Sequence, residues 1–175
     1  MKKVLAFAGS TSSSSINKKL AKYTAENLQS SEFNLIDLRD YNVPIYSIDE
    51  EQKGIPEDVH KFTNLLDNYH GFIVSLAEHN GSFAAAYKNL FDWTSRINKK
   101  VFRDKPLLLT ATSPGGRGGA NVLNSALSYY PYMGAKEIFS FSLPNFNDNF
   151  KENTLVNKDY NNDLLEKIKH FENAL

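Results

Sequence analysis

The sequence predicts an α/β protein built on an open, doubly wound parallel sheet of five strands, with helices on both faces in three layers. Short, uninterrupted apolar runs alternate with longer amphipathic segments, which is the pattern of buried parallel strands joined by crossover helices. Three of these runs end in segments rich in glycine or hydroxyl side chains, as strands do at the ligand-binding edge of such a sheet. With right-handed crossovers, the expected strand order is 2-1-3-4-5.

The five expected strands are short and largely apolar. Val4-Leu5-Ala6-Phe7-Ala8 comes first, and its lack of polar alternation is typical of a strand covered on both faces. In chain order, the expected strands cover residues 4–8, 33–38, 71–77, 106–112 and 137–143.

Amphipathic segments follow the strands and predict five helices. Pro56-Glu57-Asp58 is a typical helix start, because proline fits the first turn and acidic side chains favour the positive end of a helix. The expected helices cover residues 17–29, 56–69, 83–98, 120–130 and 163–174. Residues 39–56 are rich in turn-forming side chains and are expected to form a mobile loop, and residues 144–162 an irregular connection.

The helix expected at residues 83–98 carries two apolar stripes. One, which can cover the sheet, consists of Ala86, Leu90, Trp93 and Ile97. The other consists of Phe83, Tyr87 and Phe91. Because a second stripe is unfavourable in water, it needs a partner, and Tyr87 and Phe91 are expected in the core or at an interface. One hypothesis is that this helix packs against its counterpart in a homodimer or homotetramer.

The composition limits the function classes. The 175 residues fit one domain, 1–175, with a substantial core. Lysine and arginine balance aspartate and glutamate at 20 each, so no positive field favours nucleic acid or a membrane as partner. The absence of cysteine excludes disulfides and thiol chemistry and fits a cytoplasmic protein. The first apolar run ends at Gly9, too short for a signal peptide, and no stretch is long enough to span a bilayer.

Residues 9–17, Gly-Ser-Thr-Ser-Ser-Ser-Ser-Ile-Asn, lie between the first strand and the first helix. Such a turn brings hydroxyl groups, backbone N–H groups and the positive end of a helix to one place, which suits a phosphate. A flexible serine linker or a plain helix cap would have the same composition. The loops at 77–82 and 113–119 favour the phosphate site, because loops after strands one, three and four converge where the strand order reverses.

Three blocks of the chain resemble motifs of the NAD(P)H-dependent FMN reductase family of flavodoxin-like proteins, which includes quinone, azo-dye and chromate reductases. Residues 9–17 resemble its G-S-x-R-x-x-S-x-N phosphate loop. Residues 77–82 and 88–93, Ala-Glu-His-Asn-Gly-Ser and Lys-Asn-Leu-Phe-Asp-Trp, resemble its P-E-Y-N-G-S and K-N-A-L-D-W pair. Residues 113–119, Ser-Pro-Gly-Gly-Arg-Gly-Gly, resemble its glycine-rich turn after strand four.

The resemblance implies a flavodoxin-like fold, a bound FMN cofactor, and NADPH or NADH as electron donor. It implies that the FMN phosphate is held by Ser10, Ser15 and Asn17. The ribityl chain and ring would lie against Glu78, His79, Asn80 and Gly81, and the other ring edge against Ser113, Gly115 and Gly116. The same loops add Ser12, Ile16 and Ala77 to the cofactor-binding residues. Small hydroxyl residues and glycines suit these roles, because they let the backbone approach a phosphate or a flat ring closely.

Two positions depart from the family pattern. Ser12 stands where the family usually has arginine, so the phosphate loop lacks a permanent charge, which Lys18, Arg117 or a neighbouring chain could supply. Ala77 and His79 stand where the family usually has proline and tyrosine. A histidine there would bring a group with an ordinary pKa of about 6.5 close to the flavin.

The implied activity is a two-electron reduction, in which hydride from a reduced nicotinamide passes by way of FMN to a flavin, a quinone or another small acceptor. The flavin itself performs this chemistry, so no catalytic side chain is expected. The alternative is a one-electron carrier like flavodoxin, although such carriers are typically acidic. A phosphorylated receiver would need acidic residues where this chain has Gly9-Ser10, and a P-loop NTPase would need Gly-Lys-Ser/Thr.

Several polar residues have ordinary interpretations. Glu78 and Asp92 are more simply a loop contact and a helix-surface charge than an acid–base pair. His60 and His70 have no second ligand at metal spacing, so no metal site is expected. For Arg117, a contact to a phosphate of the nicotinamide cofactor and a solvated loop charge are both open.

Overall fold

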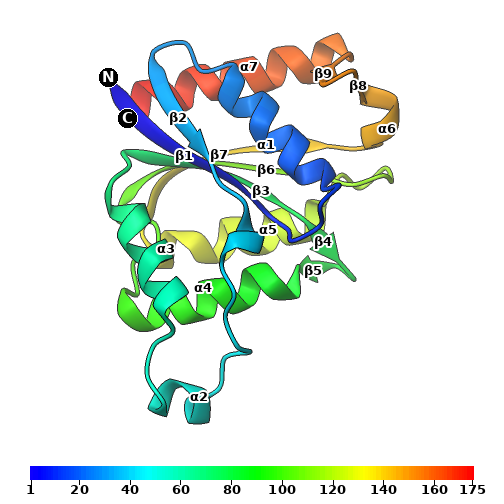
Figure 1. Ribbon diagram of the computed structural model, residues 1–175. Helices are drawn as coiled ribbons and strands as arrows, with labels where there is room; N and C mark the ends of the chain where they lie inside the picture. Colours follow the sequence, from blue (N-terminus) through cyan, green and yellow to red (C-terminus); the bar gives the residue numbers. More distant parts are fainter.

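Five parallel strands form the central sheet of the computed structural model, which describes residues 1–175 (Figure 1). The strands are β1 (Lys2–Gly9), β2 (Ser31–Leu35), β3 (Gly71–Leu76), β6 (Lys105–Thr112) and β7 (Ala135–Leu143). Their order across the sheet is β2-β1-β3-β6-β7, and every neighbouring pair is parallel. Counted along the chain, this is the order 2-1-3-4-5, so the predicted fold class is confirmed.

Helices cover both faces of the sheet and give three layers (Figure 1). They are α1 (Ile16–Glu26) and α7 (Lys158–Ala174) on one face and α3 (Glu57–Asp67), α4 (Ala85–Ile97) and α5 (Ala120–Tyr129) on the other. Strand side chains alternate between the faces: Leu5 and Phe7 join a cluster of 24 buried residues with α3, α4 and α5. Val4 and Ala6 join one of 14 with α1 and α7. None of the helices has the length and apolar character that a membrane span requires.

Capping side chains set boundaries that the apolar pattern does not show. α7 begins at Lys158 and not at residue 163, because the Asn157 side chain accepts hydrogen bonds from backbone N–H groups of its first turn. β2 ends at Leu35 and not at residue 38, because Asp37 caps a short 3-10 helix, η1 (Leu38–Asp40).

Short elements occupy the segments expected as loops. They are α2 (Ile48–Gln52), β4 (Glu78–His79), β5 (Ser82–Phe83), α6 (Phe146–Asn149), β8 (Phe150–Lys151) and β9 (Thr154–Leu155). Each is too short to show a hydrophobic period in the sequence. The pairing of β4 with β5 also removes Phe83 from the predicted helix, so α4 begins at Ala85.

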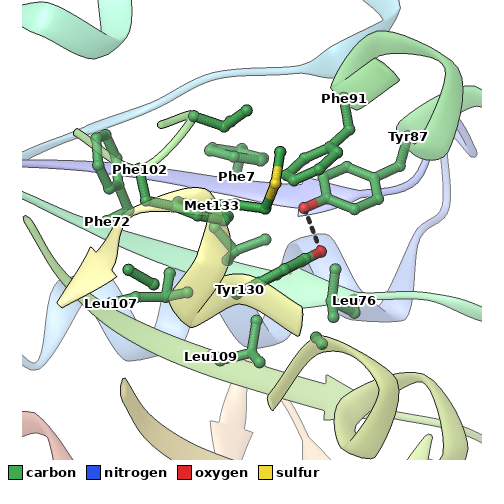
Figure 2. Packing of buried hydrophobic residues seen from close by; sticks show 14 of the residues in the cluster. Phe7, Phe72, Leu76, Tyr87, Phe91, Phe102, Leu107, Leu109, Tyr130 and Met133 are labelled. Atoms are coloured by element: carbon green, nitrogen blue, oxygen red, sulfur yellow. Dashed lines mark hydrogen bonds between the residues drawn. The ribbon is translucent and has the colours of Figure 1, made fainter. Parts of the chain in front are cut away.

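Tyr87 and Phe91 of the aromatic stripe of α4 pack inside the chain, so of the two expected placements the core is observed, and these two residues need no second copy of the chain. Tyr87 and Phe91 are only 4% and 7% exposed. Figure 2 shows both rings against Tyr130, and Tyr130 belongs to the 3-10 helix η2 (Tyr130–Met133) that follows α5. Nothing in the α4 pattern indicates this partner, because it comes from a distant part of the chain.

The other predicted stripe of α4 is only half buried. Leu90 and Trp93 lie in the core, whereas Ala86 is exposed and Ile97 is 38% exposed. The difference matters for function, because an exposed Ala86 leaves space beside the first loop of the sheet edge.

Candidate functional site

A crevice of 280 Å³ lies at the carboxyl edge of the sheet, where the loops after β1, β3 and β6 meet. This convergence was predicted and is confirmed. The predicted residues that line the crevice are Ser10, Ser12, Ser15, Ile16, Asn17, Ala77, Glu78, His79 and Ser113. The predicted residues outside this lining are Asn80, Gly81, Gly115 and Gly116.

Three lining residues were missed by the sequence prediction: Ser14, Thr112 and Pro114. Each has a sequence signal that could have found it. Ser14 belongs to the same run of hydroxyl side chains as Ser12, while Thr112 and Pro114 flank the predicted Ser113.

The first loop presents unused backbone donors to the crevice. Ser15 is the N-cap of α1, and its hydroxyl accepts a hydrogen bond from the Lys18 backbone N–H at 3.1 Å. The backbone N–H groups of Ile16 and Asn17, in the same first turn, have no acceptor within the protein. Two donors at the positive end of an 11-residue helix therefore point to the site with no partner of their own.

The Asn17 side chain, in contrast, makes its hydrogen bonds within the protein. Its Oδ1 accepts from the Ser75 hydroxyl at 2.8 Å and from the Thr112 backbone N–H at 3.1 Å. Its Nδ2 donates to the Thr112 carbonyl at 3.2 Å, and the residue is only 3% exposed. Asn17 thus ties α1 to the ends of β3 and β6, and what it offers the crevice is its backbone N–H.

No cation belongs to the first loop. Its hydroxyls bond locally, with Ser12 N–H donating to Ser10 Oγ at 3.2 Å and Ser12 Oγ lying 3.4 Å from Ser14 Oγ. Lys18, considered as a replacement for the missing arginine, pairs with Asp37. Hydrogen bonds from Arg39 and then Lys18 hold the pKa of the Asp37 carboxyl well below its usual range, so this carboxylate remains paired.

Glu78 acts as a helix cap. One oxygen of its carboxylate accepts from the Val122 backbone N–H at 2.9 Å, and the other accepts from the Asn121 side chain at 3.4 Å. α5 has no cap from its own N-cap residue, so the carboxylate compensates its positive end. Asp92 instead pairs with Lys88 at 2.7 Å, and the two acids have separate partners.

The second and third loops carry exposed backbone. Asn80 and Gly81 form the turn of the β4–β5 hairpin with φ of 52° and 79°. In the third loop, the Gly115 carbonyl accepts from the Ser113 hydroxyl at 3.1 Å and from the Asn145 backbone N–H at 3.0 Å. A Cβ at Gly115 would meet no atom within 4 Å, so its bare backbone faces open space. No group of three histidine, aspartate or glutamate side chains is arranged to hold a metal ion.

Comparison with protein families and curated proteins gives matches over this chain. A family model described as NADPH-dependent FMN reductase matches residues 2–169. An NADPH azoreductase of Bacillus sp. (strain OY1-2) is 32% identical over 106 residues, which cover 61% of this chain and 56% of the azoreductase. A quinone reductase of Escherichia coli (strain K12) is 30% identical over 80 residues, 45% of this chain and 43% of that enzyme. The matched segments thus span about half the length of these two relatives.

Among solved structures, a flavoenzyme NAD(P)H:(acceptor) oxidoreductase from Paracoccus denitrificans superposes on this chain with a TM-score of 0.78. The superposition covers 99% of this chain and 97% of that one, at 21% sequence identity. At this identity, the likeness shows the fold alone, and it confirms the predicted flavodoxin-like architecture.

Proposed function

This chain belongs to the family of NADPH-dependent FMN reductases, and we propose that its crevice holds FMN and uses it to reduce a small acceptor. The electron donor is NADPH or NADH, and the acceptor is a flavin, a quinone or a molecule of similar redox chemistry. The proposal rests on family membership together with the donors that the crevice presents.

The observation that carries the proposal is the pair of unpartnered backbone N–H groups at Ile16 and Asn17. A phosphate accepts hydrogen bonds from such groups at the start of a helix, and the hydroxyls of Ser10 and Ser15 add further donors. This set fits the FMN phosphate without a permanent charge. Because the phosphate is charged, each of these hydrogen bonds is charge-assisted, and several of them act together in place of an ion pair.

The other two loops supply the walls for the ring. The hairpin turn and Gly115 present backbone with little side chain, so a flat ring can lie close to them. In this assignment the FMN-binding residues are Ser10, Ser12, Ser15, Ile16, Asn17, Ala77, Glu78, His79, Asn80, Gly81, Ser113, Gly115 and Gly116.

When bound, FMN supplies a ring that exchanges two electrons with a nicotinamide and with an acceptor. The residues of the chain bind and orient the reactants. No side chain is assigned as a catalytic acid or base, because Glu78 caps α5 and Asp92 pairs with Lys88.

We further infer a cytoplasmic homodimer or homotetramer. The chain contains no cysteine and so can form no disulfide, which is compatible with a reducing compartment. Tyr129 and Tyr132 are 55% and 80% exposed, and their ring centroids lie 6.3 Å apart. Tyr129 also lines a cavity of about 220 Å³ together with Phe83 and Phe91. Such an aromatic patch favours contact with a second copy. Sedimentation velocity at micromolar concentration should show a dimer or tetramer, and a monomer would contradict the assembly.

The activity is tested by an anaerobic absorbance spectrum of the FMN-loaded protein, to which NADPH and NADH are added in separate cuvettes. Bleaching of the flavin band at a catalytic rate is expected with at least one donor. Flavin that binds but is bleached by neither would favour the one-electron carrier. Absence of flavin binding would contradict the cofactor assignment.

The phosphate assignment is tested by removing one N–H group alone. Ile16 is the first helical residue, where proline is tolerated, and Ser15 has ψ of 119°, which a following proline accepts. We expect Ile16→Pro to weaken FMN binding tenfold or more, since a hydrogen bond to a charged group contributes about 1.5–3 kcal/mol. Ile16→Ala, which keeps the N–H group, is the matched control. Equal FMN affinity in the two variants would contradict the assignment.

A further inference from the structure

A second cavity, of 470 Å³, lies beside the crevice. Thr11 lines this cavity, whereas Ser10 and Ser12 on either side of it line the crevice. The phosphate loop is therefore a wall shared by two cavities. On its far side, the second cavity is bounded by α4 and by the segment that leads from β2 towards α2, which Figure 1 shows running beside α4.

This cavity has the composition of a small-molecule site. Leu38 and Leu90, each 3% exposed, form part of an apolar floor. Thr11, Arg39 and Asn42 add polar groups, and the Asn42 side chain has no hydrogen-bond partner within the protein. Pockets of about 300–1,000 Å³ with apolar walls and a few polar groups are typical of sites for small ligands.

The wall opposite the phosphate loop is fixed in place. The Asn89 side chain donates to the Pro44 carbonyl at 2.9 Å and accepts from the Tyr46 backbone N–H at 2.8 Å. Trp93 Nε1 donates to the same Pro44 carbonyl at 2.7 Å. The cavity is thus formed in advance, and a ligand would not have to order this segment.

Arg39 presents an oriented guanidinium to the cavity. Its Nη2 donates to Asp37 Oδ2 at 2.7 Å, and its Nε donates to Asp37 Oδ1 at 3.1 Å. The Nη1 nitrogen of Arg39 has no hydrogen-bond acceptor within the protein. The side chain is 48% exposed, so a ligand in the cavity can reach this nitrogen. Lys18 pairs with the same carboxylate, so two cations share the Asp37 anion, while Asp40 adds a second negative charge near Arg39. A planar guanidinium held in this way is well suited to a phosphate group.

We propose that this cavity binds the adenosine end of the nicotinamide donor, with Arg39 holding one of its phosphate groups. The inference rests on the proposed function, in which the nicotinamide end must reach the flavin in the crevice. A cavity that shares a wall with the crevice can hold the opposite end of the same donor molecule. The apolar floor suits the adenine ring, and the free Asn42 amide can hydrogen-bond to its edge.

The proposal is tested by calorimetric titration of the FMN-loaded protein with adenosine 2′,5′-bisphosphate and, separately, with adenosine 5′-monophosphate. FMN fills the phosphate loop, so binding of these probes reports on the second cavity. We expect saturable binding that weakens tenfold or more in Arg39→Gln, since one charged hydrogen bond is lost. If Arg39→Gln loses affinity for the bisphosphate alone, Arg39 contacts the 2′-phosphate of NADPH. If it loses affinity equally for both probes, Arg39 contacts the 5′-phosphate.

Two further variants locate the site. Ala86 is exposed and lines the cavity, so the larger side chain of Ala86→Leu should fill part of the cavity. This variant should bind both probes more weakly, while the absorbance spectrum of its bound FMN stays unchanged. Lys99→Gln removes an exposed positive charge that does not line the cavity, so this variant should bind both probes as the wild type does. No saturable binding to the wild type, or unchanged binding in Arg39→Gln and Ala86→Leu, would overturn the proposal.

The two proposals fail separately. If neither NADPH nor NADH bleaches the flavin, the proposed activity fails, yet probe binding that depends on Arg39 still establishes the nucleotide site. If the flavin is bleached but the Arg39→Gln and Ala86→Leu variants bind both probes normally, the activity stands and the site is wrong.

Discussion

The side chain of Asn17 is hydrogen-bonded to both the backbone N–H and the backbone carbonyl of Thr112, at 3.1 and 3.2 Å. Asn17 lies in the first turn of α1, which follows β1, and Thr112 ends β6, so one amide joins the start of this helix to a strand two places away from β1 in the sheet. The strand between them contributes Ser75, whose hydroxyl donates to the same Asn17 oxygen. The unpartnered N–H groups of α1 are thereby held at the sheet edge.

Asn17→Ala should lower both stability and FMN affinity. The change leaves the Ser75 hydroxyl and the polar backbone of Thr112 buried without partners, and each unsatisfied group costs about 1–3 kcal/mol. We expect the free energy of unfolding of the flavin-free protein, measured in urea, to fall by about 2 kcal/mol or more. Loss of FMN affinity with an unchanged free energy of unfolding would instead make the side chain a direct ligand.

Glu78→Ala should destabilise the protein, because the Val122 N–H at the start of α5 loses its acceptor. The expected loss is about 1 kcal/mol, typical of a helix cap. Glu78→Gln keeps an oxygen acceptor and should lose less. With FMN bound, Glu78→Gln should keep its rate of reduction by the nicotinamide donor within a few fold, measured by stopped-flow absorbance. A rate near zero in this variant would show that the carboxylate acts as an acid or base.

Gly9→Ala and Gly115→Ala are expected to behave in opposite ways. A Cβ at Gly9 would lie 3.1 Å from Tyr87 Cγ and 3.3 Å from Leu76 Cδ2, so this variant should lose about 1–3 kcal/mol of stability from overpacking. A Cβ at Gly115 meets no atom within 4 Å, so this variant should unfold at the wild-type urea concentration. It should nevertheless bind FMN more weakly, because the added methyl group lies where the ring is proposed to rest. Wild-type FMN affinity in Gly115→Ala would place the ring elsewhere.

The central strands β1, β3 and β6 were predictable from the sequence because burial on both faces gives apolar runs, and the strand order followed from their alternation with helices. Val4 to Ala8 is a continuous apolar run, and its short length and the glycine that follows it mark it as a buried strand. Boundaries were less predictable, since they depend on single hydrogen bonds such as the Asn157 cap of α7. The pattern of α4 allowed a place in the core for Tyr87 but could not show its partner, because Tyr130 lies 43 positions away in the sequence.

The candidate site was predictable as a set of loops but not as a set of roles. The composition of residues 9–17 and their place after β1 identify the crevice. Composition does not show whether a side chain contacts a ligand or other residues of the protein. The side chains of Asn17 and Glu78 both accept hydrogen bonds from backbone N–H groups within the protein. The second cavity left no sequence signal, because Thr11, Arg39 and Ala86 come together only through the path from β2 to α2.

The buried hydroxyls of Tyr87 and Tyr130 lie 2.6 Å apart and form a hydrogen bond (Figure 2). Tyr87→Phe or Tyr130→Phe alone leaves the other hydroxyl buried without a partner, and each should cost about 1–3 kcal/mol. The double variant leaves no unsatisfied group, so it should cost less than the sum of the two single changes. Urea unfolding of the four proteins measures this coupling, and strictly additive losses would show that the two hydroxyls do not depend on each other.

The same pair should make stability fall at alkaline pH. Burial raises the pKa of Tyr87 above its ordinary value of about 10, and burial followed by the nearby Tyr87 raises that of Tyr130. Above pH 10 the unfolded chain releases both protons while the folded chain keeps them, so the free energy of unfolding decreases as the pH rises. Each tyrosine contributes a slope of about 1.4 kcal/mol per pH unit. Urea unfolding between pH 8 and pH 11 should therefore give a steeper decline for the wild type than for the double Phe variant. Parallel curves would mean that the hydroxyls ionise equally in both states.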